Sequence, residues 1–369
     1  MRRALASIIV VLFAAPAAAQ AADPGLWIKT SQLTKPAWYR QGLASNPATG
    51  DVFFSGSFSG ITLTHNESEV NQNANAIPKD VADREKYNHI GDIAFDPGEG
   101  GRILLPLESY APLAQDTNPS KTASIAVIDP KTLAWEYYVK LDPSEIDKAQ
   151  WVAADPEHGL VWTLGDTSLL AYNIADVNPA NAAPNAAPIH SVKRFDGILP
   201  NGAGGAVVIG NRIFLSQLFN GINRVISIDL TTGASQVEIE VASADEEEGL
   251  DTGPYLDGFL HWELVPGAGL SNTQVLNFVP QGARLALKLK PARVKAGKKA
   301  ALTATATVLT GGFSIPLRDV EVRLGGKRAK TNAHGRAKLT VKLTRGKYRA
   351  HAFYNGLRTA TRTIRATLR

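Results

Sequence analysis

The feature that most constrains the fold is a repeat of short apolar segments separated by turn residues. The clearest copy begins at His89 with HIGDIAFD and continues through GRILLPLE, ASIAVIDPKTL and AWEYYVKL to Leu141. Similar runs follow the segments QGLA, WVAA, GAVV and EGLD, all between residues 41 and 280. Four short strands per unit, at intervals of about 40 to 60 residues, are typical of a β-propeller blade.

Five such starts predict a five-bladed β-propeller, and six blades are the alternative if the Asn-rich segment 65–87 hides strands. We interpret that segment as an inserted loop with a helical turn near residues 80–86. The last unit shows only three strands. We expect the isolated segment Leu26–Leu33 to supply the fourth, because it would close the ring and cover an open sheet edge. A β-sandwich or two stacked sheets would fit the regular spacing less well.

The strand–turn segments also carry a resemblance. ASIAVIDPKTL and RVISIDLTTG resemble segments of secreted bacterial propellers of the YVTN and quinoprotein-like type. The resemblance covers residues 36 to 280 and implies an architecture without identifying an activity.

Charge divides the chain into an acidic body and a basic tail. Residues 283–369 contain 22 Lys and Arg against two acids, Asp319 and Glu321, which leaves 17 basic and 32 acidic residues elsewhere. Alternating apolar and basic residues with regular turns predict about seven strands in the tail, as in an immunoglobulin-like β-sandwich. We therefore expect a signal peptide at 1–21, the propeller at 24–281 and a basic sandwich at 283–369.

Two turn motifs in the tail resemble those of bacterial immunoglobulin-like and carboxypeptidase-regulatory-like modules. The matching residues are Thr331, Asn332, Gly335 and Ala337 in the first motif, and Gly346, Tyr348 and Gly356 in the second. The resemblance implies an accessory module without catalytic activity.

The N-terminal segment has the pattern of a bacterial export signal. Arg2 and Arg3 precede an apolar run, Ala4–Phe13, that is too short to span a bilayer, and small residues suitable for cleavage follow. An uncleaved anchor helix is the alternative. We expect an extracytoplasmic protein, secreted or associated with the cell wall. The chain has no Cys, which excludes disulfides, thiolate catalysis and Cys-ligated zinc.

Loops that enter the innermost strands of a propeller surround its axis, where binding sites collect. The predicted ligand-binding residues are His89, Asp92, Glu108, Gln150, Trp151, Glu248 and Asp251, with Arg40, Gln41, Asn201 and Glu247 at equivalent positions. Hard cations prefer converging carboxylates, so Asp92, Glu248 and Asp251 are candidate metal ligands. The candidate cofactor is a divalent cation such as calcium, and its identity is left unassigned. The alternative is that these side chains satisfy backbone groups in turns.

No nucleophile elbow, H-E-x-x-H motif or P-loop occurs, so no catalytic residue is assigned. The sequence favours a secreted binding protein that engages a ligand or protein partner at the central face of the propeller. A metal-dependent hydrolase or lactonase-like enzyme at the channel is the alternative.

The basic tail predicts attachment to a cell-envelope polyanion, while docking on the acidic body or a solubility role remains open. Export argues against a nucleic-acid partner, and we expect a monomer.

Overall fold

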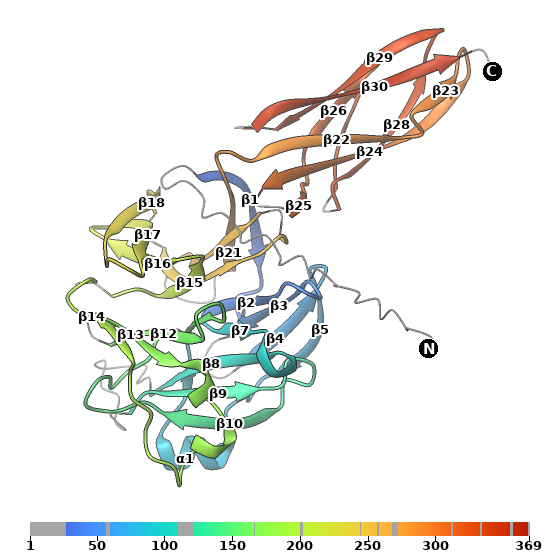
Figure 1. Cartoon of the computed structure of the whole chain (residues 1–369). Helices are drawn as coiled ribbons and strands as arrows, with labels where there is room; N and C mark the ends of the chain where they lie inside the picture. The colour runs from blue at the N-terminus through green and yellow to red at the C-terminus, as the bar shows by residue number, and fades with distance from the viewer. Residues whose placement is uncertain are drawn as a thin grey trace, which may run out of the picture.

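The computed structural model describes residues 27–56, 60–109, 122–165, 167–199, 202–243, 245–256, 258–267, 272–310, 313–332, 334–354 and 357–367. The predicted signal peptide and Asn201 lie outside these ranges. Within them the chain is almost entirely β, with one short α-helix, α1 (Lys79–Glu85), and three 3-10 turns. Figure 1 shows a ring of sheets and a tail that extends from it on the side of β1 and β21.

Four antiparallel sheets follow one another along the ring. The first contains β2 (Gly42–Asn46), β3 (Asp51–Ser55), β4 (Ile61–His65) and β5 (Ser68–Asn73). The second contains β6 (His89–Ile90), β7 (Ala94–Asp96), β8 (Arg102–Glu108), β9 (Ser124–Ile128) and β10 (Trp135–Lys140). The third contains β11 (Ala153–Asp155), β12 (Leu160–Gly165), β13 (Ser168–Asn173) and β14 (Lys193–Phe195). The fourth contains β15 (Gly205–Ile209), β16 (Arg212–Phe219), β17 (Ile222–Asp229) and β18 (Ser235–Val241).

The fifth sheet joins the two ends of this part of the chain. It contains β19 (Glu246–Thr252), β20 (Leu260–Val265), β21 (Thr273–Pro280) and the N-terminal strand β1 (Trp27–Lys35). β1 pairs antiparallel with β21, from Trp27 opposite Pro280 to Lys35 opposite Thr273. This pairing confirms the prediction that the isolated N-terminal segment is the outer strand of the last sheet.

The first strand of each sheet contacts the first strand of the next, and the contacts form a closed cycle. β2 contacts β7, which contacts β11, then β15, then β19, which returns to β2. Separate apolar layers fill the spaces between successive sheets: Phe53 packs with Ile103 between the first and second, and Leu43 with Val275 between the first and fifth. A single sandwich would have one core, so this arrangement is that of a β-propeller.

Each sheet is covered on both faces by its neighbouring sheets, which explains why the central strands are continuous apolar runs. Every residue of β8 (RILLPLE) and β9 (SIAVI) is buried. A strand that is solvated on one face would alternate apolar and polar residues instead.

The prediction of an inserted loop at residues 65–87 was partly wrong. The helical turn is present as α1, but Ser68–Asn73 forms β5, the outer strand of the first sheet. Most of its side chains are exposed, so it lacks the apolar period that marks a strand. Asn71 and Asn73 donate hydrogen bonds to the carbonyls of Lys131 and Leu133, in the turn between β9 and β10 of the second sheet, at 3.1 and 2.8 Å.

The tail is built from two sheets that share one apolar core. One contains β22 (Arg284–Lys290), β24 (Lys299–Thr310), β25 (Phe313–Pro316) and β28 (Arg336–Lys342). The other contains β23 (Arg293–Lys295), β26 (Glu321–Leu324), β27 (Lys327–Lys330), β29 (Gly346–Tyr354) and β30 (Leu357–Thr367). Leu302, Val322 and Ile364 are among the core residues contributed from both sides. The described residues of the tail thus form nine strands where about seven were expected.

The tail packs against the ring at the β1–β21 edge. Val279 belongs to the apolar core of the tail, and Ile28 and Phe259 pack against it. Arg318 of the tail forms an ion pair with Glu67 in the first sheet. Among the described residues, no helix is long and apolar enough to cross a membrane.

Candidate functional site

The carboxylate of Asp92 lies where the inner strands of the ring meet. β6 ends at Ile90 and β7 begins at Ala94, and the break between them frees Asp92 from the pairing with β8. One oxygen, Oδ1, accepts a hydrogen bond from the N–H of Leu43 at 3.0 Å. The other, Oδ2, accepts from the N–H groups of Ala206 and Leu250 at 3.0 and 3.1 Å. The carboxylate therefore joins the first, fourth and fifth sheets.

The backbone of Asp92 makes the remaining connection. Its N–H donates to the carbonyl of Gln150 at 3.0 Å, and its carbonyl accepts from the N–H of Val152 at 3.1 Å, next to β11 of the third sheet. The side chain is fully buried, and this burial raises its pKa well above the usual range although the three N–H donors lower it. These contacts support the alternative in which Asp92 satisfies backbone groups.

Glycines allow the inner strands to approach this closely. A Cβ atom on Gly42 would lie 2.3 Å from the Cα of Asp92, and one on Gly249 would lie 2.6 Å from the Cα of Gly42. On Gly205 it would lie 2.7 Å from Asp92 Oδ2. The backbones of the inner strands are therefore in direct contact at these positions. The sequence contained a sign of this close approach, because the glycines belong to the repeated segments QGLA, GAGG and EGLD.

Buried hydroxyl groups on the second strands add a set of contacts that the sequence analysis missed. Ser55, opposite Gly42, donates to the carbonyl of Gly91 at 2.8 Å, and Ser216, opposite Gly205, donates to that of Glu248 at 2.7 Å. Each of these bonds links one sheet to the next. Both serines lie opposite a glycine of the inner strand, and this shared position is the pattern that could have revealed these contacts.

Two buried glutamates lie near Asp92 in the fifth sheet. Burial is the main cause that raises the pKa of Glu248 and Glu263 well above the usual range, and the Asp92 carboxylate raises both further. Arg40 opposes the shift at Glu263. Glu263 is fully buried and neither of its carboxylate oxygens has a hydrogen-bond partner. It lies on β20, and nothing in the sequence distinguished it from a core residue.

Asp251 joins the first and fifth sheets. Its Oδ2 accepts hydrogen bonds from Ser45 of β2, at 2.6 Å, and from the hydroxyl of Tyr255. Burial raises the pKa of Asp251 to about 7, against the effect of these two donors. Both Asp92 and Asp251 thus direct oxygens at protein donors.

His89 and Glu108 form a second, separate group at the edge of the ring's inner strands. His89 Nδ1 lies 2.6 Å from Glu108 Oε1, and Lys148 Nζ lies 3.8 Å from Glu108 Oε2. The side chain of Gln150 is exposed, whereas Trp151 is fully buried and its carbonyl accepts a hydrogen bond from Thr163 at 2.7 Å. Among the predicted ligand-binding residues, His89 and Glu108 thus lie next to each other.

The predicted metal ligands are not among the groups of three convergent ligand atoms in the described residues. Among the residues that the structure describes, the one group of three whose ligand atoms all lie within 4.8 Å of one another is Asp142, Glu145 and His190. Asp92, Glu248 and Asp251 do not form such a group.

The tail presents a different kind of site, a basic face on the sheet of β22, β24 and β28. On β24, Thr303 and Thr305 form a central column. Each threonine pairs on both sides with a basic residue, namely Lys290 and Lys338 for Thr303, and Lys288 and Arg336 for Thr305. All four basic side chains are exposed. Since adjacent strands lie about 4.8 Å apart, the two rows of cations are about 10 Å apart.

No acidic side chain neutralises this face from its own strands, because β22, β24 and β28 contain no Asp or Glu. The two acids of the tail lie elsewhere and have partners there. Glu321 pairs with Arg323 on the other sheet, and Asp319 lies 3.8 Å from Lys330. Within the described residues of the tail, no carboxylate thus compensates the positive charge of this threonine-centred face.

Comparison with known proteins gives no family. No family model matches the sequence, and no curated protein shows significant similarity. Solved structures that match include the β-propeller domain of Cps50 (Swd1) from Myceliophteria thermophila, with TM-score 0.36 and 8% identity, covering 68% of this chain and 99% of that one. A chain of the Mitotic Checkpoint Complex matches with TM-score 0.36 and 8% identity, over 90% of this chain and 99% of that one.

A third match is PorZ, an essential bacterial surface component of the type-IX secretion system of Porphyromonas gingivalis. Its TM-score is 0.35 at 11% identity, over 88% of this chain and 51% of PorZ. Structural similarity with TM-scores this low does not establish a fold. The assignment of the fold therefore depends on the strand pairing described above.

Proposed function

We propose that this chain is an exported binding protein whose basic tail attaches it to phosphate-rich surfaces of the cell envelope, while the ring presents loops to a ligand or protein partner. The ring is a five-bladed propeller and the tail an immunoglobulin-like sandwich in this proposal. Five sheets with a closed cycle of inner strands support the blade count, and two sheets around one core support the sandwich. Export rests on the pattern of residues 1–21.

The observation that carries the proposal is the exposed, uncompensated basic face of β22, β24 and β28. Among the described residues, Lys288, Lys290, Arg336 and Lys338 are exposed with the acidic ring present. The described contacts between the two parts include apolar residues and the Arg318–Glu67 pair, which lie away from this face. This face is therefore free for an external polyanion, which argues against the alternative that the tail's charge serves to dock on the ring.

The expected strength follows from simple electrostatics. Each Lys or Arg near an anionic surface contributes about 1 kcal/mol, so four contribute about 4 kcal/mol. Because exposed charges are screened over about 10 Å at 0.1 M salt, the attachment should weaken steeply as salt rises.

A metal-dependent hydrolase at the axis of the ring is not favoured. The carboxylate of Asp92 already accepts three backbone hydrogen bonds, and Asp251 accepts two from side chains. A metal there would have to displace these donors.

The test uses the full chain with two probes, vesicles of one part phosphatidylglycerol to three parts phosphatidylcholine, and soluble polyphosphate. One variant replaces Lys288, Lys290, Arg336 and Lys338 with Gln. The matched control replaces four exposed basic residues from separate parts of the chain, Lys79, Lys131, Lys298 and Lys327, with Gln. Both variants change the net charge equally.

We expect the wild type to bind in low salt, the first variant to bind about 100-fold or more weakly, and the control to lose much less. Binding to polyphosphate but not to vesicles would identify the source of phosphate as a polymer, and the reverse as a lipid surface. Equal losses in both variants, or no binding by the wild type to either probe, would overturn the proposal.

A further inference from the structure

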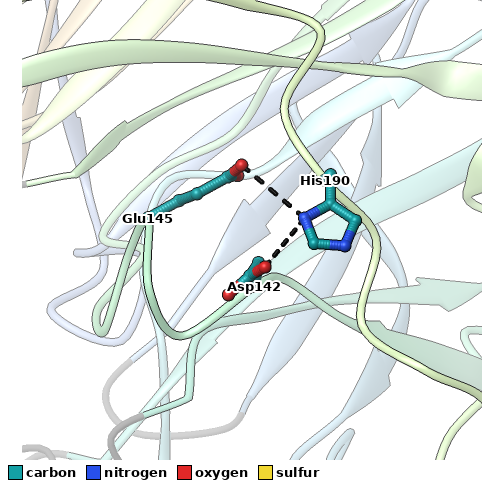
Figure 2. A group of neighbouring side chains, drawn as sticks. All are labelled: Asp142, Glu145 and His190. Atoms are coloured by element: carbon teal, nitrogen blue, oxygen red, sulfur yellow. Dashed lines mark ion pairs between the residues drawn. The ribbon is translucent and has the colours of Figure 1, made fainter.

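Three possible metal ligands meet where the second and third sheets adjoin, away from the axis of the ring. Asp142 and Glu145 lie in the turn after β10, and His190 lies on the segment that leads to β14 (Figure 2). Backbone hydrogen bonds join the two segments: Ile189 N–H donates to the carbonyl of Lys140 at 2.8 Å, and Asp142 N–H donates to that of Ile189 at 3.0 Å. His190 is therefore held beside Asp142 by the main chain.

The three side chains point at a common place. Figure 2 shows His190 Nδ1 facing both carboxylates, at 2.7 Å from Asp142 Oδ2 and 3.8 Å from Glu145 Oε1. Zinc lies about 2.0 to 2.2 Å from such ligands, so two of its ligand atoms are about 3 Å apart or slightly more. The imidazole of His190 is 71% exposed and can make the small movement that this requires.

Neighbouring groups hold the second oxygen of each carboxylate. Asp142 Oδ1 accepts from the N–H of Ser144 at 2.7 Å. Glu145 Oε2 accepts from the N–H of Ser191 at 2.8 Å and from the hydroxyl of the buried Tyr172 at 3.3 Å. This leaves one oxygen of each carboxylate directed at His190. Outer-shell donors orient the ligands of metal sites in the same way.

Other histidine–aspartate pairs in the chain differ from this group. His65 Nδ1 lies 2.8 Å from Asp51, and His158 Nδ1 lies 2.8 Å from Asp155. Among the residues described, neither pair belongs to a group of three convergent ligand atoms. These pairs are the natural reference for an ordinary surface ion pair.

We propose that Asp142, Glu145 and His190 form a binding site for a divalent transition-metal ion, with Zn²⁺ as the best match. One imidazole and two carboxylates suit zinc, whereas calcium takes oxygen ligands alone. Water would complete the coordination. The positive charge of Arg194, which interacts electrostatically with Glu145, limits the affinity.

A bound ion would fasten the second sheet to the third. The ligands come from two chain segments about 45 residues apart, and the backbone bridge between Leu141 and Ile189 is a single isolated pair. Ligand binding to the folded state stabilises it, so the ion should raise the melting temperature of the ring. This site is independent of the polyanion surface proposed for the tail.

Isothermal titration of the full, metal-free chain with ZnCl₂ tests the site, with CaCl₂ as the comparison. We expect one zinc site in the wild type, at least about 10-fold weaker zinc binding in His190→Ala, and unchanged binding in the control His65→Ala. Zinc should raise the melting temperature of the wild type and of His65→Ala but not of His190→Ala. Tyr172→Phe, which removes one outer-shell donor, should weaken zinc binding by less than His190→Ala.

The proposal fails if the wild type does not bind zinc, or if His190→Ala binds it as the wild type does. Preference for calcium would also contradict it. Because His190 is largely exposed, the variant should fold, and circular dichroism of the metal-free proteins checks that it does.

Discussion

At the scale of single residues, the carboxylate of Asp92 is a shared acceptor for three sheets. In Asp92→Ala the N–H groups of Leu43, Ala206 and Leu250 would lose their acceptor while buried. Each buried unsatisfied donor costs about 1 to 3 kcal/mol, so the free energy of unfolding should fall by about 3 kcal/mol or more. The midpoint of urea unfolding measures this loss.

Asp92→Asn provides the matched comparison. The amide keeps the shape and one acceptor oxygen, so its midpoint should lie between those of Asp92→Ala and the wild type. An Asp92→Ala protein as stable as the wild type would show that relief from burying the carboxyl outweighs the three lost hydrogen bonds.

Asp251 makes stability depend on pH. Its folded pKa of about 7 lies above the value of 3.8 expected in the unfolded chain. Folding therefore favours the protonated carboxyl. The contribution of Asp251 to the free energy of unfolding is fully present below pH 3.8 and is lost as pH rises through 7. Asp251→Asn cannot ionise and retains an acceptor for Ser45 and Tyr255.

We expect the melting temperature of Asp251→Asn, relative to that of the wild type, to increase by about 2 °C or more between pH 5 and pH 8.5. Differential scanning calorimetry at both pH values measures it. A difference that stays constant with pH would mean that Asp251 does not titrate in this range.

At the scale of secondary-structure elements, β1 closes the ring. It covers the edge of β21 along its length, and Thr30 donates to the carbonyl of Asn277 at 3.0 Å. Removing residues 27–35 should expose that edge and lower the melting temperature, because an open strand edge leaves backbone groups unpaired. A synthetic peptide of this segment should restore the melting temperature by strand addition. A scrambled peptide is the control, and equal rescue by both would contradict the pairing.

Some strands could be predicted from the sequence, and others could not. β1 could be predicted because an apolar segment without a neighbour matched a unit with a missing strand. β5 could not, because its polar side chains face solvent and its Asn residues bond to another sheet through side chains. Apolar periodicity reports burial, so it is silent about a strand that is barely buried.

At the scale of the whole molecule, the charge asymmetry was visible in the sequence, but its arrangement was not. Counting residues gave a basic tail; the pairing of β22, β24 and β28 places four cations on one face around Thr303 and Thr305. The acids Asp319 and Glu321 pair with basic residues outside this face. Which cations lie together on one face depends on strand register, which composition does not contain.

The sequence predicted that the repeated starts would meet, but it did not predict the contacts that Asp92 makes there. The repeated starts correctly brought Asp92 together with the segments of Leu43, Ala206 and Leu250. They did not reveal that the backbones lie so close together that the Asp92 carboxylate accepts a hydrogen bond from each of these three segments. The group of Asp142, Glu145 and His190 was not predicted, because its members lie outside the repeated starts and meet only through the bridge between two sheets.

By itself the sequence determined the repeating sheets, the closing strand and the division into acidic ring and basic tail, because apolar period and charge are local properties of the chain. The tertiary structure alone decided which polar groups meet across sheets, and so whether Asp92 faces a ligand or backbone N–H groups. A hydrogen bond forms only when donor and acceptor lie about 3 Å apart. These contacts therefore depend on the strand register and on the closure of the ring, which residues distant in the sequence determine together.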